Sequence, residues 1–577
     1  MNQHPENWAS EGKEPEQPNT PQPKQSRNDP FWLSGAVFLC VAAVIFEIYQ
    51  HVTDPQMMGF LHDDGVYAIT AKALAQGQGY RLLNLPGLPF QVKYPIFYPL
   101  ILSLGWLWEP RFPQNLSALH GLTISFAALA IPLLYIYLRQ IKQCGKGLAG
   151  LISLLVAANF HFIYYATSLM SEAPYFFFSL LTLWLAETGG KQPSKRRLGG
   201  IILASVLAFH TRTIGLALIG AITLLFLLRK QWKTAGLYLG ITSGVTILPW
   251  LLWVKTHAMP LNALNYPMAY VYGGYGIEYG INSPASLGLY LQALMSKGVE
   301  PIINNLVNLL LPQVGYWLGG SPLGFTLLSL GLASLLILQG IRALRTQAFS
   351  ASGLYIACYL IGVALWMYPN QAIRFSVVIL PWLWLASFRA IAGFMNPDRL
   401  ERFQNAMPKT LSRWGSALAL MGIGAFLLWP SVGGYHLLAR MRGQHWIEPS
   451  GQTAPLWADY QSTFAFLKTK TPPTAGVAGI WDPIFYLYTN HPGFGLFASS
   501  LQPFHGQVTP ESFRRLHASL EHYGVQYIVV EPFIVNQQVQ APENPVATLL
   551  MQKAIPDFRA VYTAPHGFLK VYQFQTH

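Results

Sequence analysis

The amino-acid sequence predicts a polytopic α-helical membrane protein with about eleven spans and a small C-terminal α/β domain outside the membrane. The first observation is a series of apolar runs of about 18 to 22 residues, which are long enough to cross a bilayer as helices. The second is the charge content. Charged residues make up 11% of the 577 residues, against roughly 25% in soluble proteins, and aromatic residues reach 14%.

The N-terminal 30 residues differ from the rest of the chain. Residues 1–30 are rich in Pro, Gln and charged side chains and have little to bury, so they are expected to form a disordered cytoplasmic tail. The apolar run at 31–50 lacks a small-residue cleavage site, and the tail before it is unlike a secretory signal. We therefore expect a retained signal-anchor helix as the first span.

The orientation of the spans follows from the basic residues of the short loops, which favour the cytoplasmic side. Basic clusters occur at 139–147, 191–197, 229–233, 341–345 and 396–403. If all five are cytoplasmic, the N-terminus lies inside and the C-terminus outside. Spans are then predicted near 31–50, 117–138, 147–166, 170–187, 199–211, 213–228, 234–254, 322–341, 350–369, 371–393 and 412–430.

Three segments need separate treatment. The runs 199–211 and 213–228 are short and flank Arg212, so they are expected to form a hairpin whose tip reaches only the outer interface. The stretches 95–109 and 301–318 are apolar but short. Because counting 95–109 as a span would reverse every later loop, both stretches are predicted to be interfacial helices.

The outer face is expected to carry loops 51–116 and 255–321 and the tail from 431 to 577. In that tail, STFAFLKTK and SLEHYG favour helices, whereas GVAGI, FYLYT, VQYIVVEP and FLKVYQF are β-rich, a pattern typical of a small α/β domain. Cys40, Cys144 and Cys358 lie elsewhere, so this domain has no internal disulfide. The net charge of +13 is attributed to the positive-inside bias, and no nucleic-acid partner is expected.

An acidic pair, Asp63 and Asp64, follows shortly after the first span, in a chain that is poor in acidic residues. One of the two carboxylates would serve as the N-terminal cap of a helix over Gly65–Gln76, which Gly77 would end. Capping requires only one carboxylate. The second therefore has no structural explanation from the sequence.

Other ionisable residues are predicted at the same depth as this pair. Lys93, Glu172, Arg212 and Arg374 are distant in sequence but fall at outer ends of spans or in the first outer loop. Each has an alternative role: Glu172 in helix-dipole stabilisation, the arginines in snorkelling, and Lys93 as a solvated residue. Charges at membrane depth usually line a cavity or pathway, and fixed cations suit a phosphate near the lipid headgroups. The convergence of these residues predicts such a cavity.

These residues also carry a resemblance to a known family. The segments DDGVYAITAKALAQGQGY, VKYPIFYP, HTRTIGLAL and QAIRFSVVILP resemble the protein O-mannosyltransferase-related branch of the glycosyltransferase C superfamily, which includes the aminoarabinose transferase of lipid A. The resemblance covers about 31–430, and residues 431–577 are similar to the soluble domains appended in that superfamily. The family's acidic pair is often Asp-Glu, whereas this chain has Asp-Asp.

The resemblance implies transfer of a sugar from a polyprenyl-phosphate carrier to a hydroxyl of a lipid, glycan or protein acceptor, at the outer face of a bacterial inner membrane. By motif, Asp63 resembles the catalytic base, with Asp64 capping the helix or raising the pKa of the base. Lys93, Arg212 and Arg374 resemble the cations that bind the donor phosphate. Tyr67, Tyr94 and Glu172 are placed in the same substrate cavity. A lipid phosphate departs without a general acid, so one base suffices, and attack from the opposite side inverts the anomeric centre.

Two other classes of function stay open at this stage. A secondary transporter or flippase of lipid-linked sugars also buries charges, but typically near mid-membrane and with internal repeats, which we do not find in the sequence. A scaffold protein would work through its outer domain and would not need the acidic pair. No cofactor is assigned with certainty, and metal dependence stays open: His62, His161 and His257 could join Asp63 or Glu172 around a divalent cation, but their spacing matches no ligand motif.

Overall fold

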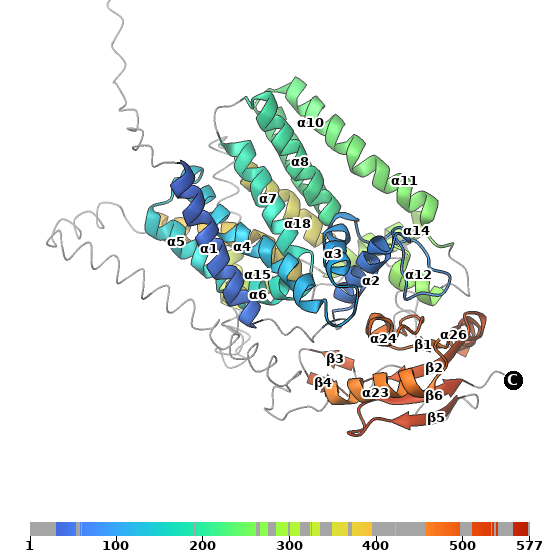
Figure 1. Cartoon of the computed structure of the whole chain (residues 1–577). Helices are drawn as coiled ribbons and strands as arrows, with labels where there is room; N and C mark the ends of the chain where they lie inside the picture. The colour runs from blue at the N-terminus through green and yellow to red at the C-terminus, as the bar shows by residue number, and fades with distance from the viewer. Residues whose placement is uncertain are drawn as a thin grey trace, which may run out of the picture.

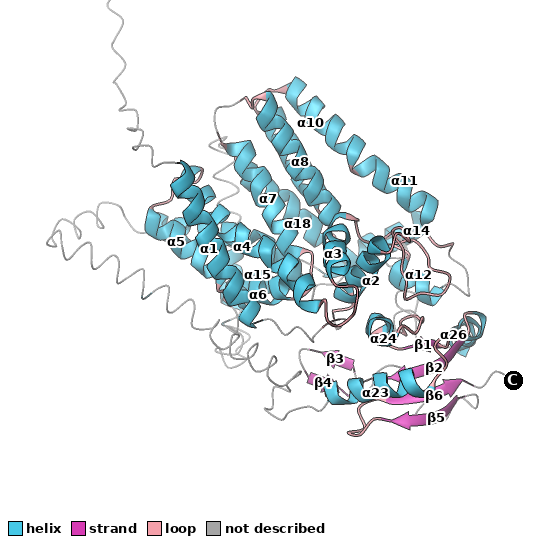
Figure 2. Ribbon diagram, viewed as in Figure 1, coloured by secondary structure: helices cyan, strands magenta, loops and turns pink. Residues whose placement is uncertain are grey.

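The computed structural model describes most of the helical part and most of the C-terminal domain (Figure 1). The described residues are 31–52, 58, 61–188, 192–260, 266–274, 284–297, 300–311, 324, 326–334, 338, 349–366, 372–394, 422, 456–496, 510–531, 533–535, 538–540 and 558–574. The predicted tail at 1–30 and the domain boundary at 431 lie outside these residues. Figure 2 shows that the strands lie together in a smaller part of the molecule, beside the larger helical part.

The helical part agrees closely with the apolar runs of the sequence. Its helices are α1 (Phe31–Val52), α2 (Asp63–Ala75), α3 (Phe97–Trp108), α4 (Leu116–Gln140), α5 (Lys146–Ala157), α6 (Phe160–Thr167), α7 (Glu172–Glu187), α8 (Lys195–Thr211), α9 (Gly215–Leu228), α10 (Trp232–Val245), α11 (Ile247–His257), α12 (Tyr266–Tyr272), α14 (Pro284–Lys297), α15 (Glu300–Leu310), α18 (Ala351–Ala364), α19 (Ala372–Ser376), the 3-10 helix η2 (Val377–Ile379) and α20 (Leu380–Phe394).

The chain is a multi-pass membrane protein. Within the described residues, four helical segments are long and apolar enough to cross a bilayer, namely Gly35–Val52, Leu116–Gln140, Trp232–His257 and Ala372–Arg389. A bent pair, α5 with α6, would add a fifth. The count of about eleven stays a prediction. Nearly half of the span predicted at 322–341 and nearly all of that at 412–430 lie outside the described residues, and α9 and α18 are shorter apolar helices.

The single span predicted at 147–166 is wrong in detail, because the helix breaks at Asn159. The axes of α5 and α6 meet at 55°. The Asn159 side chain accepts a hydrogen bond from the backbone N–H of Phe162 (3.1 Å), and this bond caps α6 as a new helix. Its amide nitrogen donates to the carbonyl of Leu309 on α15 (2.8 Å), so the break is tied to a neighbouring helix.

The hairpin predicted around Arg212 is present. Helix α8 ends at Thr211 and α9 begins at Gly215. The turn is tight because Gly215 lies against the backbone of Phe209, where an added Cβ would come within 2.7 Å of Cα. Arg212 lies at the tip of the hairpin, directly after α8.

The C-terminal domain contains both helices and a sheet. Its helices are α23 (Leu456–Lys470), α24 (Asp482–Thr489) and α26 (Pro510–His522), and its strands are β1 (Gly476–Ala478), β2 (Val525–Val530), β3 (Phe533–Val535), β4 (Gln538–Gln540), β5 (Phe558–Thr563) and β6 (Lys570–Phe574). Four strands form a sheet in the order β1-β2-β6-β5, in which β1 and β2 are parallel and the other pairs antiparallel. Strands β3 and β4 pair separately. The sequence therefore predicted the class of this domain correctly.

One β-rich segment of that prediction is wrong, because FYLYT forms the second half of α24. The residues around it explain the helix. Asp482 lies in the first turn, Pro483 occupies one of the first helical positions, and Asn490 ends the helix in the left-handed conformation (φ 60°). These end signals outweigh the strand preference of the aromatic residues between them.

The C-terminal domain packs against the helical part near α2 and α12 (Figure 1). A single hydrophobic cluster contains Tyr67 of α2 and Tyr272 of α12 together with Leu487 of α24 and Ile528 of β2. Helix α24 therefore lies on the same core as the segment that carries the acidic pair.

The topology can be tested on the segment Trp232–His257, whose 26 residues would span about 39 Å as a helix at 1.5 Å per residue. In a variant without Cys40, Cys144 and Cys358, we expect Lys255→Cys to react with a membrane-impermeant thiol reagent in intact cells. Lys233→Cys, at the other end of the segment, should react only after permeabilisation, because it follows a basic cytoplasmic loop. The reverse pattern would invert the orientation.

Candidate active site

Four charged side chains from separate elements form one largely buried chain of ion pairs. Arg374 of α19 places one guanidinium nitrogen 2.7 Å from Asp63 Oδ2 and donates Nε to Glu172 Oε1. Arg212 lies on the other side of this oxygen, with its guanidinium 2.6 Å from Glu172 Oε1. Along this series of ion pairs, Asp63–Arg374–Glu172–Arg212, negative and positive side chains alternate. The side chain of Glu172, which lies between the two arginines, is only 2% exposed.

Secondary-structure ends position each of these side chains. Asp63 is the first residue of α2, Glu172 is the first residue of α7, and Arg212 directly follows α8. A carboxylate in a first helical turn is favoured because it interacts with unpaired N–H groups and the positive end of the helix dipole. The sequence places the two acids at two such turns, and the hairpin brings Arg212 to the same depth.

Aromatic side chains line one side of this ion-pair chain. The Tyr94 hydroxyl donates a short hydrogen bond to Asp63 Oδ1. The Tyr67 ring lies between Tyr94 and Tyr98, with ring centroids 5.1 Å and 4.9 Å away, and its hydroxyl is 3.0 Å from Ser171 Oγ. Ser171 also accepts a bond from Arg212 (3.0 Å). Tyr67 and Tyr94 thus join the charged residues, as expected, and Ser171 was not predicted.

Lys93 completes the group of three predicted cations and lies beside the segment that carries α12. Its Nζ donates to the backbone carbonyl of Val271 (3.1 Å), in the segment that carries α12. Its positive charge also lowers the pKa of Asp63. With Asp63 and Glu172, the three cations leave one net positive charge in the described part of the site.

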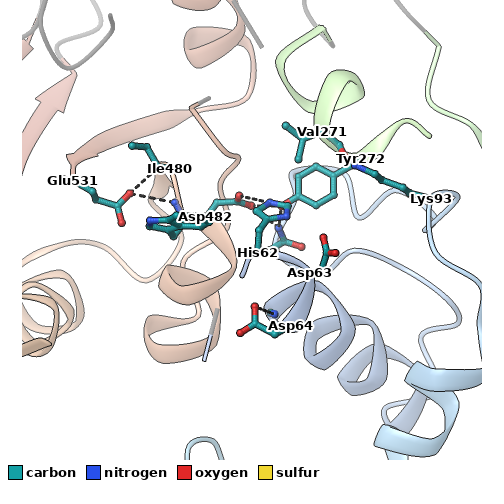
Figure 3. Close-up of polar contacts among 12 residues, drawn as sticks. His62, Asp63, Asp64, Lys93, Val271, Tyr272, Ile480, Asp482 and Glu531 are labelled. Carbon is teal, nitrogen blue, oxygen red and sulfur yellow. Dashed lines mark hydrogen bonds and ion pairs between the residues drawn. The ribbon is translucent and has the colours of Figure 1, made fainter. Parts of the chain in front are cut away.

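The second acid of the pair points elsewhere, as Figure 3 shows. Asp64 is 3% exposed, and its Oδ1 accepts the backbone N–H of Gly65 (2.8 Å). The helix begins at Asp63, two residues earlier than expected, and its N-cap is His62, so neither acid is the N-cap. Both acids lie in the first turn instead, where they interact with the helix dipole.

The pKa of Asp63 is lowered in this structure, and Asp64, which was expected to raise it, is not among the main causes of the shift. Burial by itself raises the pKa of Asp63, but the charges of Arg374 and Lys93 and the Tyr94 hydrogen bond outweigh it. The pKa falls to about 2, so Asp63 is ionised at neutral pH. A carboxylate held this firmly is a weak base until one of these partners leaves.

The three histidines considered as metal ligands have other neighbours. The His257 ring stacks on Trp253 at 3.8 Å, the His161 ring contacts Phe160, and His62 lies beside Asp482. Within the described residues, no three His, Cys, Asp or Glu side chains gather in an arrangement that could hold a metal ion.

A polar junction joins α2 to the C-terminal domain directly beside Asp63 (Figure 3). Asp482 of α24 accepts hydrogen bonds from Asn84 Nδ2 and the Tyr272 hydroxyl, both 2.7 Å from its Oδ2. Its Oδ1 lies 3.6 Å from Nε2 of His62. Sequence reasoning missed Asp482 because Asp-Pro is an ordinary helix start, and no local pattern connects it to residues about 400 positions away.

The fold is that of a known membrane protein. A solved structure described as ArnT from Cupriavidus metallidurans bound to undecaprenyl phosphate is similar, with a TM-score of 0.51 and 14% sequence identity over 94% of this chain and 98% of that chain. The apo state of the same protein gives a TM-score of 0.49, with 13% identity over 94% and 97%. Neither a protein-family model nor a curated protein matches the sequence. The fold expected from the family resemblance is thereby confirmed.

The central position of Glu172 can be tested by its effect on stability. Glu172→Gln keeps the shape of the side chain but leaves Arg212 without its carboxylate and Arg374 with only Asp63. Breaking a buried ion pair from one side costs roughly 3–5 kcal/mol, so we expect a clearly lower thermal midpoint in detergent.

Glu109→Gln is the matched control, because Glu109 pairs with Arg111 at 2.8 Å on the surface, where Arg111 is 74% exposed. This variant should unfold like the unaltered protein. Equal midpoints for the two variants would contradict the central role of Glu172.

Proposed function

We propose that the protein is a membrane glycosyltransferase that moves a sugar from a polyprenyl-phosphate donor to a hydroxyl of an acceptor. The observation that carries the proposal is the ion-pair chain, in which Asp63 pairs with Arg374 and lies near Lys93, and Arg212 pairs with Glu172. Such a group offers one potential base and several phosphate partners. The similar structure of ArnT is described as bound to undecaprenyl phosphate, which supports a donor of this chemical class.

The reaction requires one base and no acid. The acceptor oxygen attacks the anomeric carbon, the bond from this carbon to the phosphate oxygen breaks, and the polyprenyl phosphate leaves with the electron pair. Asp63 takes the proton of the attacking hydroxyl. Since a phosphate monoester leaves as a stabilised anion, the cations serve to balance its growing charge, and attack from the face opposite the phosphate inverts the anomeric centre.

Donor binding would also activate the base. A phosphate competes with Asp63 and Glu172 for the guanidinium groups, because planar arginine forks bind phosphate with two parallel bonds. When Arg374 turns to the donor, Asp63 loses the partner that contributes most to lowering its pKa. Its affinity for a proton then rises. In this proposal the carboxylate becomes a competent base only when the donor is bound.

Two features support the assignment of other residues to the donor and acceptor. Glu172 Oε2 is buried and has no hydrogen-bond partner in the part of the chain that the structure describes, so it is available to accept a bond from a sugar hydroxyl. The rings of Tyr67 and Tyr94 lie beside Asp63 and would flank the sugar.

The orientation of the site belongs to the same proposal. The basic loops favour an orientation in which the ends of α1 and α8 that lead to Asp63 and Arg212 lie at the extracytoplasmic face of a bacterial inner membrane. The C-terminal domain, which contacts the same face through Asp482, would then be extracytoplasmic. A lipid donor would enter from the outer leaflet, with its phosphate at headgroup depth.

The proposal predicts that the base and the phosphate partners affect different kinetic constants. Asp63→Asn should lower kcat by about 10²–10⁴-fold, the usual range for a general base. Lys93→Gln and Arg374→Gln should instead raise the donor KM about ten- to a hundredfold, as expected for a charge-assisted bond of roughly 1.5–3 kcal/mol. Arg374→Lys should recover part of this loss, because an ammonium is a single point charge.

The measurement is the initial rate against the concentration of a polyprenyl-phosphate sugar in detergent. Asp64→Asn is the neighbouring control and should cost much less than Asp63→Asn, because the Asp64 side chain is bonded within its own helix. Full activity in Asp63→Asn would remove the proposed base. Unchanged donor dependence in both cation variants would remove the phosphate site.

A further inference from the structure

We infer that the C-terminal domain completes the catalytic centre, with Asp482 as a positioning residue that acts through His62 on the first turn of α2. The inference deepens the proposed function and rests on it for the role of Asp63. It assigns to the domain a defined task at the site: to hold the residue that precedes the base in one conformation.

The contacts of Asp482 come from three separate segments of the helical part. Asn84 lies in the loop after α2, Tyr272 ends α12, and His62 directly precedes α2. Asn84 is 0%, Tyr272 1% and Asp482 2% exposed, so these three side chains of the junction are buried. A buried carboxylate is stable only where its partners are fixed, and it therefore selects one arrangement of the two parts.

The hydrogen bonds of the junction assign a donor role to one ring nitrogen of His62. The single hydroxyl proton of Tyr272 is donated to Asp482 Oδ2, so the hydroxyl oxygen must accept at its 3.2 Å contact with His62 Nε2. Nε2 of His62 therefore carries a hydrogen, directed toward Tyr272 and lying 3.6 Å from Asp482 Oδ1. The His62 ring also packs against the Tyr272 ring, with centroids 5.4 Å apart.

His62 has a backbone conformation that needs such support. Its φ is 61°, in the left-handed region that is uncommon for residues other than glycine. Its side chain does not cap the helix, but its carbonyl accepts the first helical bond, from the N–H of Val66 (3.1 Å). The turn that begins at His62 sets the direction of Asp63, and the contacts to Tyr272 and Asp482 hold that turn.

The domain side of the junction is equally constrained. Glu531, which directly follows β2, accepts the backbone N–H groups of Ile480 and Trp481, at 2.6 Å and 3.2 Å, and so fixes the chain just before Asp482 (Figure 3). Two further contacts hold the domain along α2 and its loop. The Gly493 N–H donates to the Asn84 carbonyl (2.7 Å), and Lys72 Nζ donates to Asn490 Oδ1 (3.1 Å).

The test compares Asp482→Asn with Asp459→Asn. Asp459 is the matched control because it is a fully buried acid of the same domain that also contacts a histidine: His566 donates to it from Nδ1 (2.9 Å) and its backbone (3.0 Å). Asp459 bonds only within the domain in the described residues. Both variants remove one buried charge, but only Asp482→Asn alters the junction with α2.

Two readouts are measured on the full-length protein in detergent. The first is hydrogen–deuterium exchange of a peptide that contains the amide of Val66. The second is kcat and donor KM with a polyprenyl-phosphate sugar. Asp482→Asn should increase exchange at Val66 several-fold and lower kcat about tenfold or more, with little change in donor KM, because a misdirected base is still beside an intact phosphate site.

Asp459→Asn should lower the thermal midpoint while leaving Val66 exchange and kcat unchanged. If Asp482 acts through His62, the double variant Asp482→Asn/His62→Gln should be no slower than the slower of the two single variants. Exchange and kcat in Asp482→Asn that match those in Asp459→Asn would overturn the inference. If the unaltered protein transfers no sugar, that result counts against the proposed function, whereas Val66 exchange still decides whether Asp482 holds the turn.

Discussion

The ion pair between Asp63 and Arg374 is the interaction on which the rest of the site depends. A carboxylate that is largely shielded from water stays ionised only beside a fixed cation, and Arg374 is itself held by Glu172, which Arg212 holds in turn. The four residues come from the start of α2, the start of α7, the end of α8 and α19. Because the opposite charges of these side chains neutralise one another, the helix ends that carry them lie close together. Removing the charge of one residue leaves its ion-pair partner without a counter-charge.

In the proposed function, the same ion pairs link binding of the donor to activation of the base. In this proposal, Arg212 and Arg374 are paired with carboxylates before the donor binds and the proposed base has a pKa of about 2, so the site is stable but inactive. A phosphate is the kind of ligand that can exchange with these carboxylates, because it offers the same oxygen geometry with more charge. The C-terminal domain contributes to this exchange indirectly: through Asp482 and His62 it keeps the first turn of α2 in place while Arg374 changes partner.

Sequence reasoning found the charged centre but not its supports. Asp63, Glu172, Arg212 and Arg374 could be predicted together because charges at membrane depth are few and have a recognisable cost. Glu172 was expected as a cavity residue, and its place between the two arginines could not be read from the sequence because pairing depends on side-chain directions. Asp482, Asn84 and Tyr272 carry no local pattern, since ordinary helix starts and loops contain such residues. The break at Asn159 was missed for a related reason: the run stays apolar while one capping side chain ends the helix.

The most direct test of this account is an experimental structure of the protein with a polyprenyl phosphate bound at the site. We predict that the phosphate contacts Arg374 and at least one of Lys93 and Arg212, and that the Arg374 guanidinium has moved beyond hydrogen-bond distance of Asp63. Asp63 should then be free to accept a proton while its helix start remains against Asp482. A bound phosphate with the Asp63–Arg374 pair still intact, or a phosphate held by other residues, would contradict the account.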